Sequence, residues 1–328
     1  MRSQQSTKQF TRALVAGGSG FVGSHLCEAL IDAGTAVVCV DNFETGREEN
    51  VESCLGNALF ELVEHDITSA LPDVGPVDVV FHLASAASPV DYFRLPIETL
   101  HAGSIGTENL LNLASAHGAR FVLASTSEVY GDPQVHPQVE NYYGNVNPIG
   151  PRSVYDEAKR YAEALTSAYR RTYGVNTAIA RIFNTYGPRM RSDDGRMIPT
   201  FIGQALAERP LTVTGSGTQT RSICYVSDTV AGLVALAASS HGGPVNLGNP
   251  IEATVEEWAR RVAGVVGSSA GVNYVDATPD DPRRRCPDIT RARVELGWQP
   301  VVEVDTGLKR TVEWFVDRAS PAVTRQQH

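Results

Sequence analysis

The sequence is poor in cysteine, and its few cysteines are not spaced as metal ligands. The five are scattered, and no two form a Cys-x-x-Cys pair: Cys27, Cys39, Cys54, Cys224 and Cys286. An odd number of single cysteines argues against a disulfide framework and against a zinc site. We therefore expect reduced, mostly buried thiols and no metal ion.

The sequence also lacks an excess of positive charge and a long apolar run. Its net charge of −9 argues against nucleic acid as a partner, because the phosphate backbone attracts basic surfaces. No uninterrupted apolar run is long enough to span a bilayer, and the polar residues 1–9 lack the apolar segment of a secretory signal. We expect a cytoplasmic protein that binds neither a membrane nor nucleic acid.

Arginines nevertheless gather in a few places within this acidic chain. Arg189, Arg191 and Arg196 lie close together in sequence, Arg221 follows, and residues 283–285 are consecutive arginines. For any single arginine, a solvated surface position is the simpler interpretation. Taken together, local basic clusters suit a small anionic ligand better than a polyanion.

Short apolar runs alternate with helical segments through the first half of the chain. The run at 77–83 is nearly all apolar, as expected for a parallel strand that is buried on both faces. This alternation predicts an α/β fold with a doubly wound parallel sheet. Strands are expected at 12–16, 36–40, 60–63, 77–83, 120–124, 175–183 and 244–247, and helices at 21–33, 97–117, 154–173 and 254–266.

A glycine-rich turn follows the first expected strand. Gly17, Gly20 and Gly23 have G-x-x-G-x-x-G spacing, and the turn opens a helix whose N-terminus offers free N–H groups to a pyrophosphate. Asp41 ends the next strand, where a carboxylate would accept hydrogen bonds from the adenosine ribose and repel a 2′-phosphate. The arrangement predicts binding of NAD rather than NADP, and a purely structural turn is the alternative.

Polar residues also end two other expected strands. Asp66 with Ile67 suits the adenine edge, or else a plain cap. Residues 125–128 (Ser-Thr-Ser-Glu) follow a strand at the edge where open α/β sheets bind ligands, although serine and threonine also favour turns.

Tyr155 and Lys159 are four residues apart on an expected helix, so their side chains share one face. A neighbouring ammonium group lowers the pKa of a phenol because it favours the phenolate. Tyr155 is therefore a candidate general base, while an ordinary pair on a helix surface is the alternative.

Together, the glycine turn, Thr126, Tyr155 and Lys159 resemble the extended short-chain dehydrogenase/reductase family. Within that family the chain is most similar to the branch that decarboxylates UDP-glucuronate, for which residues 145–152 (Asn-Val-Asn-Pro-Ile-Gly-Pro-Arg) and the Arg-x-Pro-Asp-Ile element at 285–289 are typical. The resemblance covers about 11–315, through the segments 41–43, 82–85, 125–133, 145–152, 181–190, 219–222, 245–250 and 287–290.

The resemblance implies a redox-neutral reaction with tightly bound NAD. Tyr155, helped by Lys159 and Thr126, would remove the proton of the sugar 4-hydroxyl while hydride passes to NAD. The resulting β-keto acid would lose carbon dioxide, and return of the hydride would give UDP-xylose. Glu128 and Arg285 are expected near the sugar carboxylate, and either could deliver the proton to C5.

The resemblance also implies roles for individual residues. Ser127 joins Tyr155, Lys159, Thr126, Glu128 and Arg285 as a catalytic candidate. The cofactor-binding candidates are Gly17, Gly20, Phe21, Val22, Gly23, Asp41, Asn42, Asp66, Ile67, Leu83, Ala84, Tyr155, Lys159, Thr185 and Arg189. The candidates for binding the UDP-sugar substrate are Asn184, Arg196, Gln204, Arg221 and Arg285. The choice between uracil and thymine is not fixed by these residues.

The sequence departs from the family pattern near the expected active site. Residues 98–103 read Glu-Thr-Leu-His-Ala-Gly where the family has Lys-Thr-Leu-Lys-Thr-Asn, so two positive charges and an amide are absent. Ala158 stands for a glycine, Cys286 for a lysine and Tyr143 for a tryptophan. We expect the changes at 98–103 to weaken retention of the 4-keto intermediate and of NADH, so that some UDP-4-keto-pentose is released.

Other functions remain open on the same residues. A nucleotide-sugar 4,6-dehydratase would carry Thr-Asp-Glu at 126–128 and would not need Arg285, and a 4-epimerase acting on uronates would have to suppress decarboxylation. A non-catalytic NAD-binding regulator would have no use for an activated Tyr155.

The expected organisation is a Rossmann domain with a smaller, interleaved C-terminal lobe. The NAD-binding domain is expected over residues 10–184 and a mainly nucleotide-sugar-binding lobe over 185–319, with about 240–267 returning to the main sheet. The helices at 97–117 and 154–173 match those that form a four-helix dimer interface in the family, and alanines at 158, 162 and 168 would permit close packing. We therefore expect a homodimer.

Overall fold

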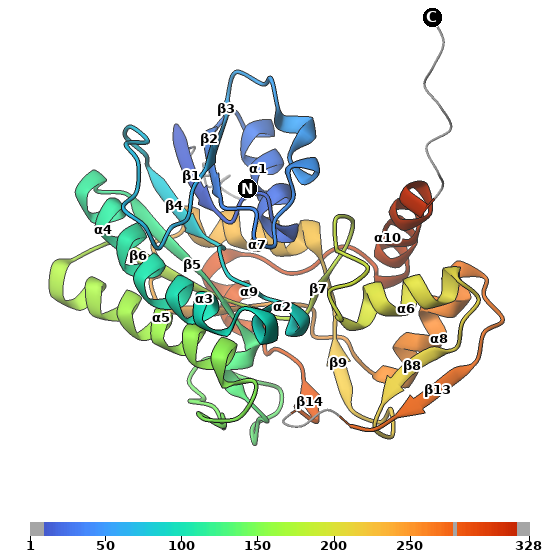
Figure 1. Cartoon of the computed structure of the whole chain (residues 1–328). Helices are drawn as coiled ribbons and strands as arrows, with labels where there is room; N and C mark the ends of the chain where they lie inside the picture. The colour runs from blue at the N-terminus through green and yellow to red at the C-terminus, as the bar shows by residue number, and fades with distance from the viewer. Residues whose placement is uncertain (1–9, 278–280, 320–328) are drawn as a thin grey trace, which may run out of the picture.

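The computed structural model describes residues 10–277 and 281–319. Its centre is a seven-stranded parallel sheet in the order β11-β6-β5-β4-β1-β2-β3 (Figure 1). The strands are β1 (Arg12–Ala16), β2 (Ala36–Asp41), β3 (Phe60–Glu64), β4 (Val79–His82), β5 (Arg120–Thr126), β6 (Thr177–Ile182) and β11 (Pro244–Leu247). This confirms the predicted α/β fold with a doubly wound parallel sheet.

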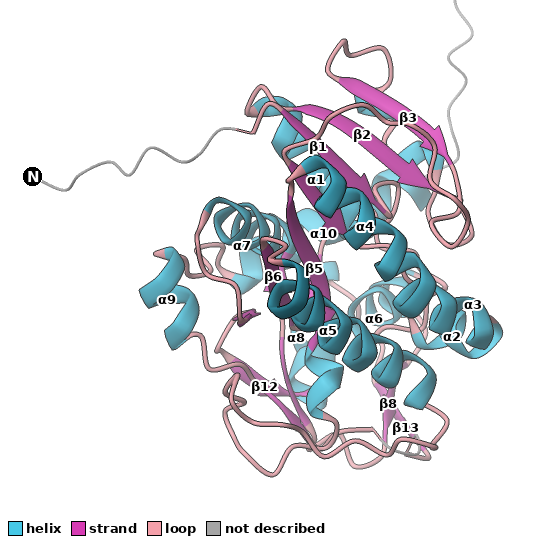
Figure 2. Ribbon diagram, turned by 90° about the vertical axis from the view of Figure 1, so that its left-hand side faces the viewer, coloured by secondary structure: helices cyan, strands magenta, loops and turns pink. Residues whose placement is uncertain are grey.

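Helices cover both faces of the sheet (Figures 1 and 2). Successive residues of a strand face opposite layers. In β1, Ala13 and Val15 belong to the core that includes α1 (Phe21–Asp32) and α7 (Val226–Ala238). Leu14 and Ala16 belong to the core that includes α4 (Thr107–His117) and α5 (Ser153–Tyr173). Burial on both sides explains why a central strand such as β1 is mostly apolar, whereas the edge strand β3 carries Glu61 and Glu64.

The strand order reverses between β1 and β4, which places a crevice beyond the carboxyl ends of these two neighbouring strands. The glycine turn leads from β1 into α1 at this edge. Beyond β4 the chain passes to α2 (Pro89–Arg94), whose first turn is capped by Ser88, the acceptor of a 3.3 Å hydrogen bond from the N–H of Asp91. The order of the strands therefore fixes where a ligand can bind.

The segment 97–117, predicted as one helix, has a π-helical turn in its middle. It consists of α3 (Pro96–His101), the turn η3 (Ala102–Gly106) and α4. A Cβ on Gly103 would lie 2.8 Å from the Cβ of Ala158 on α5, so the missing side chain allows the two segments to pack closely. Thr107 donates its hydroxyl to the carbonyl of Gly103 at 2.9 Å and ties off the widened turn.

The smaller lobe lies on one side of the sheet (Figure 1). It is built around α6 (Met197–Leu206), α8 (Val255–Val266) and α10 (Val304–Ala319), with small sheets formed by β8 (Leu211–Thr214) with β13 (Val272–Val275), and by β12 (Glu252–Thr254), β9 (Thr220–Ser222) and β14 (Arg284–Arg285). The remaining short elements are η1 (Glu48–Asn50), η2 (Glu52–Cys54), η4 (Ser127–Tyr130), β7 (Thr185–Tyr186), β10 (Cys224–Tyr225) and α9 (Thr290–Leu296).

The segment expected to return to the main sheet, about 240–267, divides between the two parts. Its strand β11 pairs with β6 at the edge of the sheet. Its helix α8 instead packs on α6 and α10, because its buried stripe includes Trp258, whose indole N–H donates to the carbonyl of Arg221 at 2.8 Å. Only the strand of this segment therefore belongs to the sheet.

All five cysteines are buried and unbridged. Within the described ranges, no group of histidine, cysteine or acidic side chains could hold a metal ion. Over the same residues, no helix has both the length and the apolar character needed to cross a membrane.

Candidate active site

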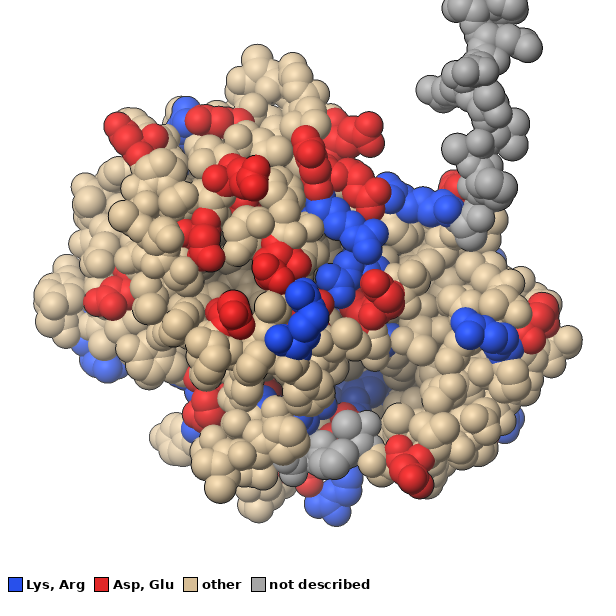
Figure 3. Space-filling model, in the orientation of Figure 1, with Lys and Arg blue, Asp and Glu red and all other residues tan. Residues whose placement is uncertain are grey.

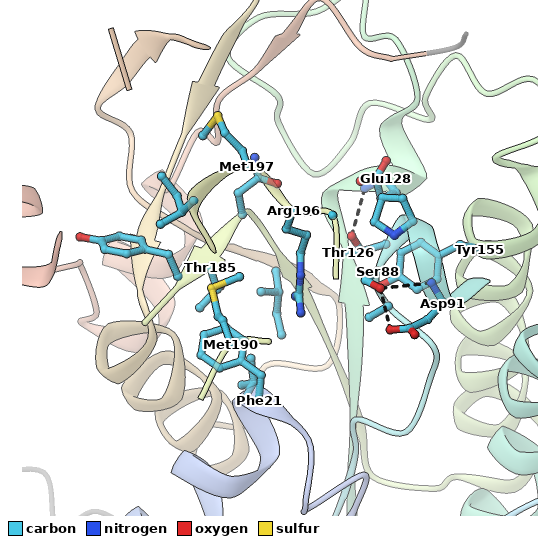
Figure 4. Close-up of a pocket in the computed structure, with 18 of the residues that line it drawn as sticks. Phe21, Ser88, Asp91, Thr126, Glu128, Tyr155, Thr185, Met190, Arg196 and Met197 are labelled. Carbon is cyan, nitrogen blue, oxygen red and sulfur yellow. Dashed lines mark hydrogen bonds between the residues drawn. The ribbon is translucent and has the colours of Figure 1, made fainter. Parts of the chain in front are cut away.

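A cavity of about 610 Å³ opens between the carboxyl edge of the sheet and the smaller lobe (Figure 4). Thr126, Glu128 and Tyr155 lie on one side of it, opposite Arg196 and Thr185 on the other. The predicted residues that line it are Gly17, Gly20, Phe21, Val22, Gly23, Leu83, Thr126, Glu128, Tyr155, Lys159, Asn184, Thr185, Arg189, Arg196, Arg221 and Arg285.

The glycine turn forms one wall through its backbone. A Cβ on Gly23 would lie 2.1 Å from the carbonyl oxygen of Gly17, and a Cβ on Gly17 would lie 2.6 Å from the backbone nitrogen of Ala84. Gly17 also has a φ of +77°, which favours glycine. The N-terminus of α1 therefore meets the cavity as bare backbone.

Asp41 lies behind this turn and not on the cavity wall. Its carboxylate accepts hydrogen bonds from the backbone N–H of Ser19 at 2.8 Å and of Phe43 at 2.9 Å. Burial raises the pKa of Asp41, and the two hydrogen bonds oppose that rise. Asp41 thus holds the shape of the turn, and each of its oxygens keeps acceptor capacity for a further partner.

Several other predicted site residues also lie outside the cavity lining. Asp66 accepts hydrogen bonds from the backbone and hydroxyl of Thr68, each at 2.8 Å, as a turn cap does. Gln204 uses both ends of its amide on Thr212 at 2.9 Å. The predicted residues that do not line the cavity are Asp41, Asn42, Asp66, Ile67, Ala84, Ser127 and Gln204.

Tyr155 and Lys159 share one face of α5, as their spacing predicts. The ammonium nitrogen of Lys159 lies 5.8 Å from the centre of the Tyr155 ring and donates to the carbonyl of Ala124 at 2.9 Å. The other side of the Tyr155 ring stacks on Tyr92, with ring centres 5.4 Å apart and planes 8° apart. The phenol is thus held in a fixed position beside the end of β5.

The protonation of this pair differs from the expectation. Burial raises the pKa of Tyr155, Glu128 raises it further, and a hydrogen bond with Thr126 opposes the rise. Burial also lowers the pKa of Lys159 to about 8. For Tyr155, desolvation therefore outweighs the lowering of the phenol pKa that was expected from Lys159.

Glu128 is held by two arginines. Its oxygens accept from Arg285 at 2.6 and 2.7 Å, and Oε2 also accepts from Arg152 at 2.9 Å. Burial alone would raise the pKa of Glu128, but the charges of Arg285 and Arg152 outweigh it and lower the pKa to about 2. Glu128 is therefore a carboxylate and not an acid at neutral pH.

The other arginines of the cavity are paired as well. Lysine and arginine side chains gather near the middle of this face, beside the hollow between the two parts (Figure 3). The pairs are Arg189 with Glu28, Arg191 with Asp91 at 2.9 Å, Arg196 with Asp194 at 2.5 Å and Arg221 with Asp281 at 2.8 Å. An anion entering here meets cations that already have partners.

Sequence reasoning missed three residues that contact this machinery: Tyr92, Arg152 and Asp281. Arg152 belongs to the 145–152 motif, which indicated that the segment is typical of the decarboxylating branch but not that this side chain binds Glu128. Tyr92 and Asp281 stand in no recognised spacing, because their partners lie far away in the sequence.

The chain was compared with known proteins. The family model for the NAD dependent epimerase/dehydratase family matches residues 13–248. The chain belongs to this family.

Relatives in the family are similar over most of their length. UDP-glucuronic acid decarboxylase 1 of Xenopus tropicalis is 53% identical over 94% of this chain and 73% of its own, and UDP-glucuronic acid decarboxylase 1 of Arabidopsis thaliana is 52% identical over 94% and 70%. Among solved structures, a UDP-glucuronic acid 4-epimerase variant of Bacillus cereus, in complex with NAD and a fluorinated UDP-glucuronic acid, matches with a TM-score of 0.83. It is 28% identical over 94% of this chain and 99% of its own.

The cavity of this epimerase/dehydratase family member fits NAD, the cofactor of the family. The backbone cradle at Gly17 and Gly23 leaves no room for a Cβ and matches the close approach that a pyrophosphate requires. The buried hydroxyl of Ser85 also lines the cavity and has no hydrogen-bond partner within the described ranges. These features leave both the cradle and a free polar group for the cofactor.

Proposed function

We propose that this protein is a lyase that decarboxylates UDP-glucuronate to UDP-xylose through a 4-keto sugar. The observation that carries the proposal is the buried cluster of Glu128, Arg152 and Arg285, which lines the same cavity as Tyr155 and Thr126. A sugar oxidised at C4 beside Tyr155 would present its C5 carboxylate toward these arginines. The names of the relatives support the same reaction.

Oxidation at C4 requires loss of the hydroxyl proton. The glycine turn at Gly17 to Gly23 would hold NAD, which would supply a hydride acceptor for C4 and a hydride donor for the final reduction. Tyr155 is positioned to take the proton, since the Tyr92 ring and the Thr126 hydroxyl fix its phenol. Lys159 keeps a positive charge near the phenol, which favours the phenolate as the proton leaves.

Decarboxylation needs the C5–C6 bond to break. Its electron pair moves into the C4 ketone as an enolate, carbon dioxide leaves, and a proton is added at C5. Arg285 can hold the carboxylate through charge-assisted hydrogen bonds. Glu128 is ionised and carries no proton of its own. It can protonate C5 only after it has received a proton from another group or from water.

The diphosphate side is proposed for Arg196 and Arg221, with Asn184 near the sugar. The carboxamide oxygen of Asn184 lies 3.5 Å from Arg285. Arg221 is 7% exposed and lines the same cavity. These cations offset the charge of a nucleoside diphosphate inside an acidic protein.

The test is incubation of the purified protein with UDP-glucuronate and NAD. We expect stoichiometric carbon dioxide and UDP-xylose, and neither from a Tyr155→Phe variant. A 4-epimerase would give an epimeric uronate without gas, and a non-catalytic regulator would leave the substrate unchanged. Absence of carbon dioxide with any nucleotide-linked uronate would overturn the proposal.

A second proposal concerns release of some UDP-4-keto-pentose. Of the departures at 98–103, Glu98 and His101 are exposed and do not line the cavity, whereas Gly103 is buried against Ala158 beside Lys159. The proposal therefore depends on the Gly103–Ala158 contact. If chromatography of the reaction mixture finds only UDP-xylose, with no 4-keto product and no NADH, the proposal of partial release is wrong.

The same contact suggests a matched pair of variants. Asparagine at position 103 would bring its Cβ to 2.8 Å from that of Ala158. We expect Gly103→Asn alone to lower the melting temperature. Adding Ala158→Gly removes the Cβ contact but keeps the carbonyl oxygen of residue 158 at 2.8 Å, so we expect it to recover part of the loss and to reduce any 4-keto release.

A homodimer through α3, η3 and α5 is also proposed. Ile97, Leu100, Ile105 and Tyr161 on these elements are 36 to 55% exposed, an apolar group that a partner copy could cover. The alanines expected at this interface do not all face it, because Ala158 and Ala162 are 3% and 1% exposed inside the protomer. Leu100→Glu should give a monomer in analytical ultracentrifugation.

A cytoplasmic location stays a prediction.

A further inference from the structure

Arg285 is paired with a carboxylate of the protein itself, that of Glu128. Both of its terminal nitrogens bind Glu128, at 2.6 and 2.7 Å, in the two-pronged geometry that suits a carboxylate. A substrate carboxylate that binds Arg285 in this way must take the place of at least one oxygen of Glu128. Binding of a uronate is therefore an exchange of partners.

The exchange would leave Glu128 short of a cation. Its side chain is only 14% exposed, and a buried charge without a partner is strongly destabilising. Arg152 is the remaining cation that touches it, at 2.9 Å from Oε2, and its own side chain is 11% exposed. Arg152 can keep this contact while Arg285 turns away.

The backbone of Arg152 is fixed where the active-site helix begins. Its carbonyl accepts from the N–H groups of Tyr155 and Asp156, each at 3.2 Å, in the first turn of α5. Its second terminal nitrogen lies 3.9 Å from Asp281, which also binds Arg221. Arg152 thus connects the helix that carries Tyr155 to the carboxylate of Glu128.

We propose that Arg152 is a positioning residue that anchors Glu128 while Arg285 exchanges Glu128 for the carboxylate of the substrate. The inference rests on the proposed decarboxylase function. It assigns to Arg152 a role only for ligands that bear a carboxylate, because a sugar without one requires no exchange. UDP-glucuronate carries the carboxylate and UDP-xylose does not. Comparing the binding of the two therefore distinguishes a role in carboxylate exchange from a general effect of Arg152 on ligand binding.

The test uses the holoenzyme in a Tyr155→Phe background, which binds without turnover. Titration calorimetry measures the Kd of UDP-glucuronate and of UDP-xylose for this parent and for the added substitutions Arg152→Gln and Arg152→Lys. We expect Arg152→Gln to weaken UDP-glucuronate by about tenfold or more, as for loss of a charged hydrogen bond. UDP-xylose should change by less than about twofold, and Arg152→Lys should recover part of the loss.

A matched control is Arg160→Gln, which removes an equal charge from the same helix. Arg160 donates to the carbonyls of Val129 and Tyr143 and does not touch Glu128. We expect it to leave the ratio of the two Kd values unchanged. Melting curves identify any variant that has lost its fold.

The outcomes separate the two proposals. If Arg152→Gln weakens both ligands equally, or neither, Arg152 does not act through carboxylate exchange and the inference is wrong. If the protein with Tyr155 intact releases no carbon dioxide, the decarboxylase proposal fails first and the exchange fails with it.

Discussion

The cavity has two walls that are built differently. We call one the cofactor wall for its proposed role: Gly17, Gly20, Gly23 and their neighbours in the turn meet the cavity largely as backbone. We call the other the substrate wall, also for its proposed role: Arg196, Arg221 and Arg285 are long cations that already hold acidic partners. A backbone cradle is rigid and specific for one shape, whereas paired side chains can exchange partners as the substrate changes during a reaction.

The largest expected effect is on the cofactor wall. Gly23→Ala places a Cβ 2.1 Å from the carbonyl oxygen of Gly17, where backbone meets backbone and neither can move aside. We expect loss of bound NAD and a destabilisation of about 3 kcal/mol. The checks are the NAD content of the purified protein and its thermal denaturation.

Gly20→Ala is the matched control in the same turn. The atom nearest to a Cβ at this position is the carbonyl oxygen of Gly17, at 3.2 Å, so a small shift accommodates it. Equal loss of NAD from both variants would contradict the view that close backbone packing is what the cofactor wall requires.

A graded effect is expected on the substrate wall. Arg221→Gln removes a buried cation without disturbing the turn, so we expect the KM for UDP-glucuronate to rise about 10- to 100-fold while NAD content stays the same. Initial rates at varied substrate check this. Asp281→Asn, which frees Arg221 from its 2.8 Å partner, should not raise the KM. Loss of NAD from Arg221→Gln would show that the walls are not independent.

Between the walls, Asp156 links stability to pH. Burial, with repulsion from Glu128, raises the pKa of Asp156 to about 7. An unfolded aspartate titrates near pH 4, so the folded protein binds an extra proton between pH 4 and 7, and stability falls as pH rises through this window. Asp156→Asn removes this dependence. We expect the stability of this variant relative to the parent to rise by about 2 to 3 kcal/mol between pH 5 and pH 8.

Urea denaturation at the two pH values measures this gain. The pKa of Glu128 is lowered to about 2, below this pH range, so its titration does not contribute to the difference in stability between pH 5 and pH 8. An unchanged difference between pH 5 and pH 8 would show that Asp156 is ionised throughout.

The smallest effect is expected away from both walls. Arg260 is 73% exposed and pairs with Glu256 one turn earlier on α8. Arg260→Ala should change stability by less than about 0.5 kcal/mol and leave the KM and NAD content alone. A larger change in the same assays would mean that the small lobe transmits surface changes to the cavity.

The sheet and the cofactor wall could be predicted from the sequence because their signals are local. β1, the glycine turn and α1 are contiguous, and Tyr155 and Lys159 are one helical turn apart. The π-helical turn at 102–106 could not be predicted, because its cause is the approach of Gly103 to Ala158 in a different helix.

The substrate wall was predicted in part. Arg221 and Arg285 were found by resemblance, but the acidic partners of these arginines depend on contacts between residues distant in sequence. Arg152 and Arg285 meet on Glu128 from positions 24 and 157 residues away. Gln204 was assigned to the substrate, yet its amide is used by Thr212 on the neighbouring strand. Sequence spacing reveals which groups are present and not which of them pair.

Among the residues that the structure describes, Arg285, on the short strand β14, is the last along the chain that lines the cavity. During synthesis from the N-terminus, the cradle at Gly17 and Gly23 and the pair Tyr155 and Lys159 therefore leave the ribosome well before it. A chain cut just before β14 would keep the groups suited to oxidising a sugar but not the arginine proposed to hold its carboxylate. Only the chain that extends through β14 therefore contains both the groups proposed for oxidation at C4 and the arginine proposed for decarboxylation.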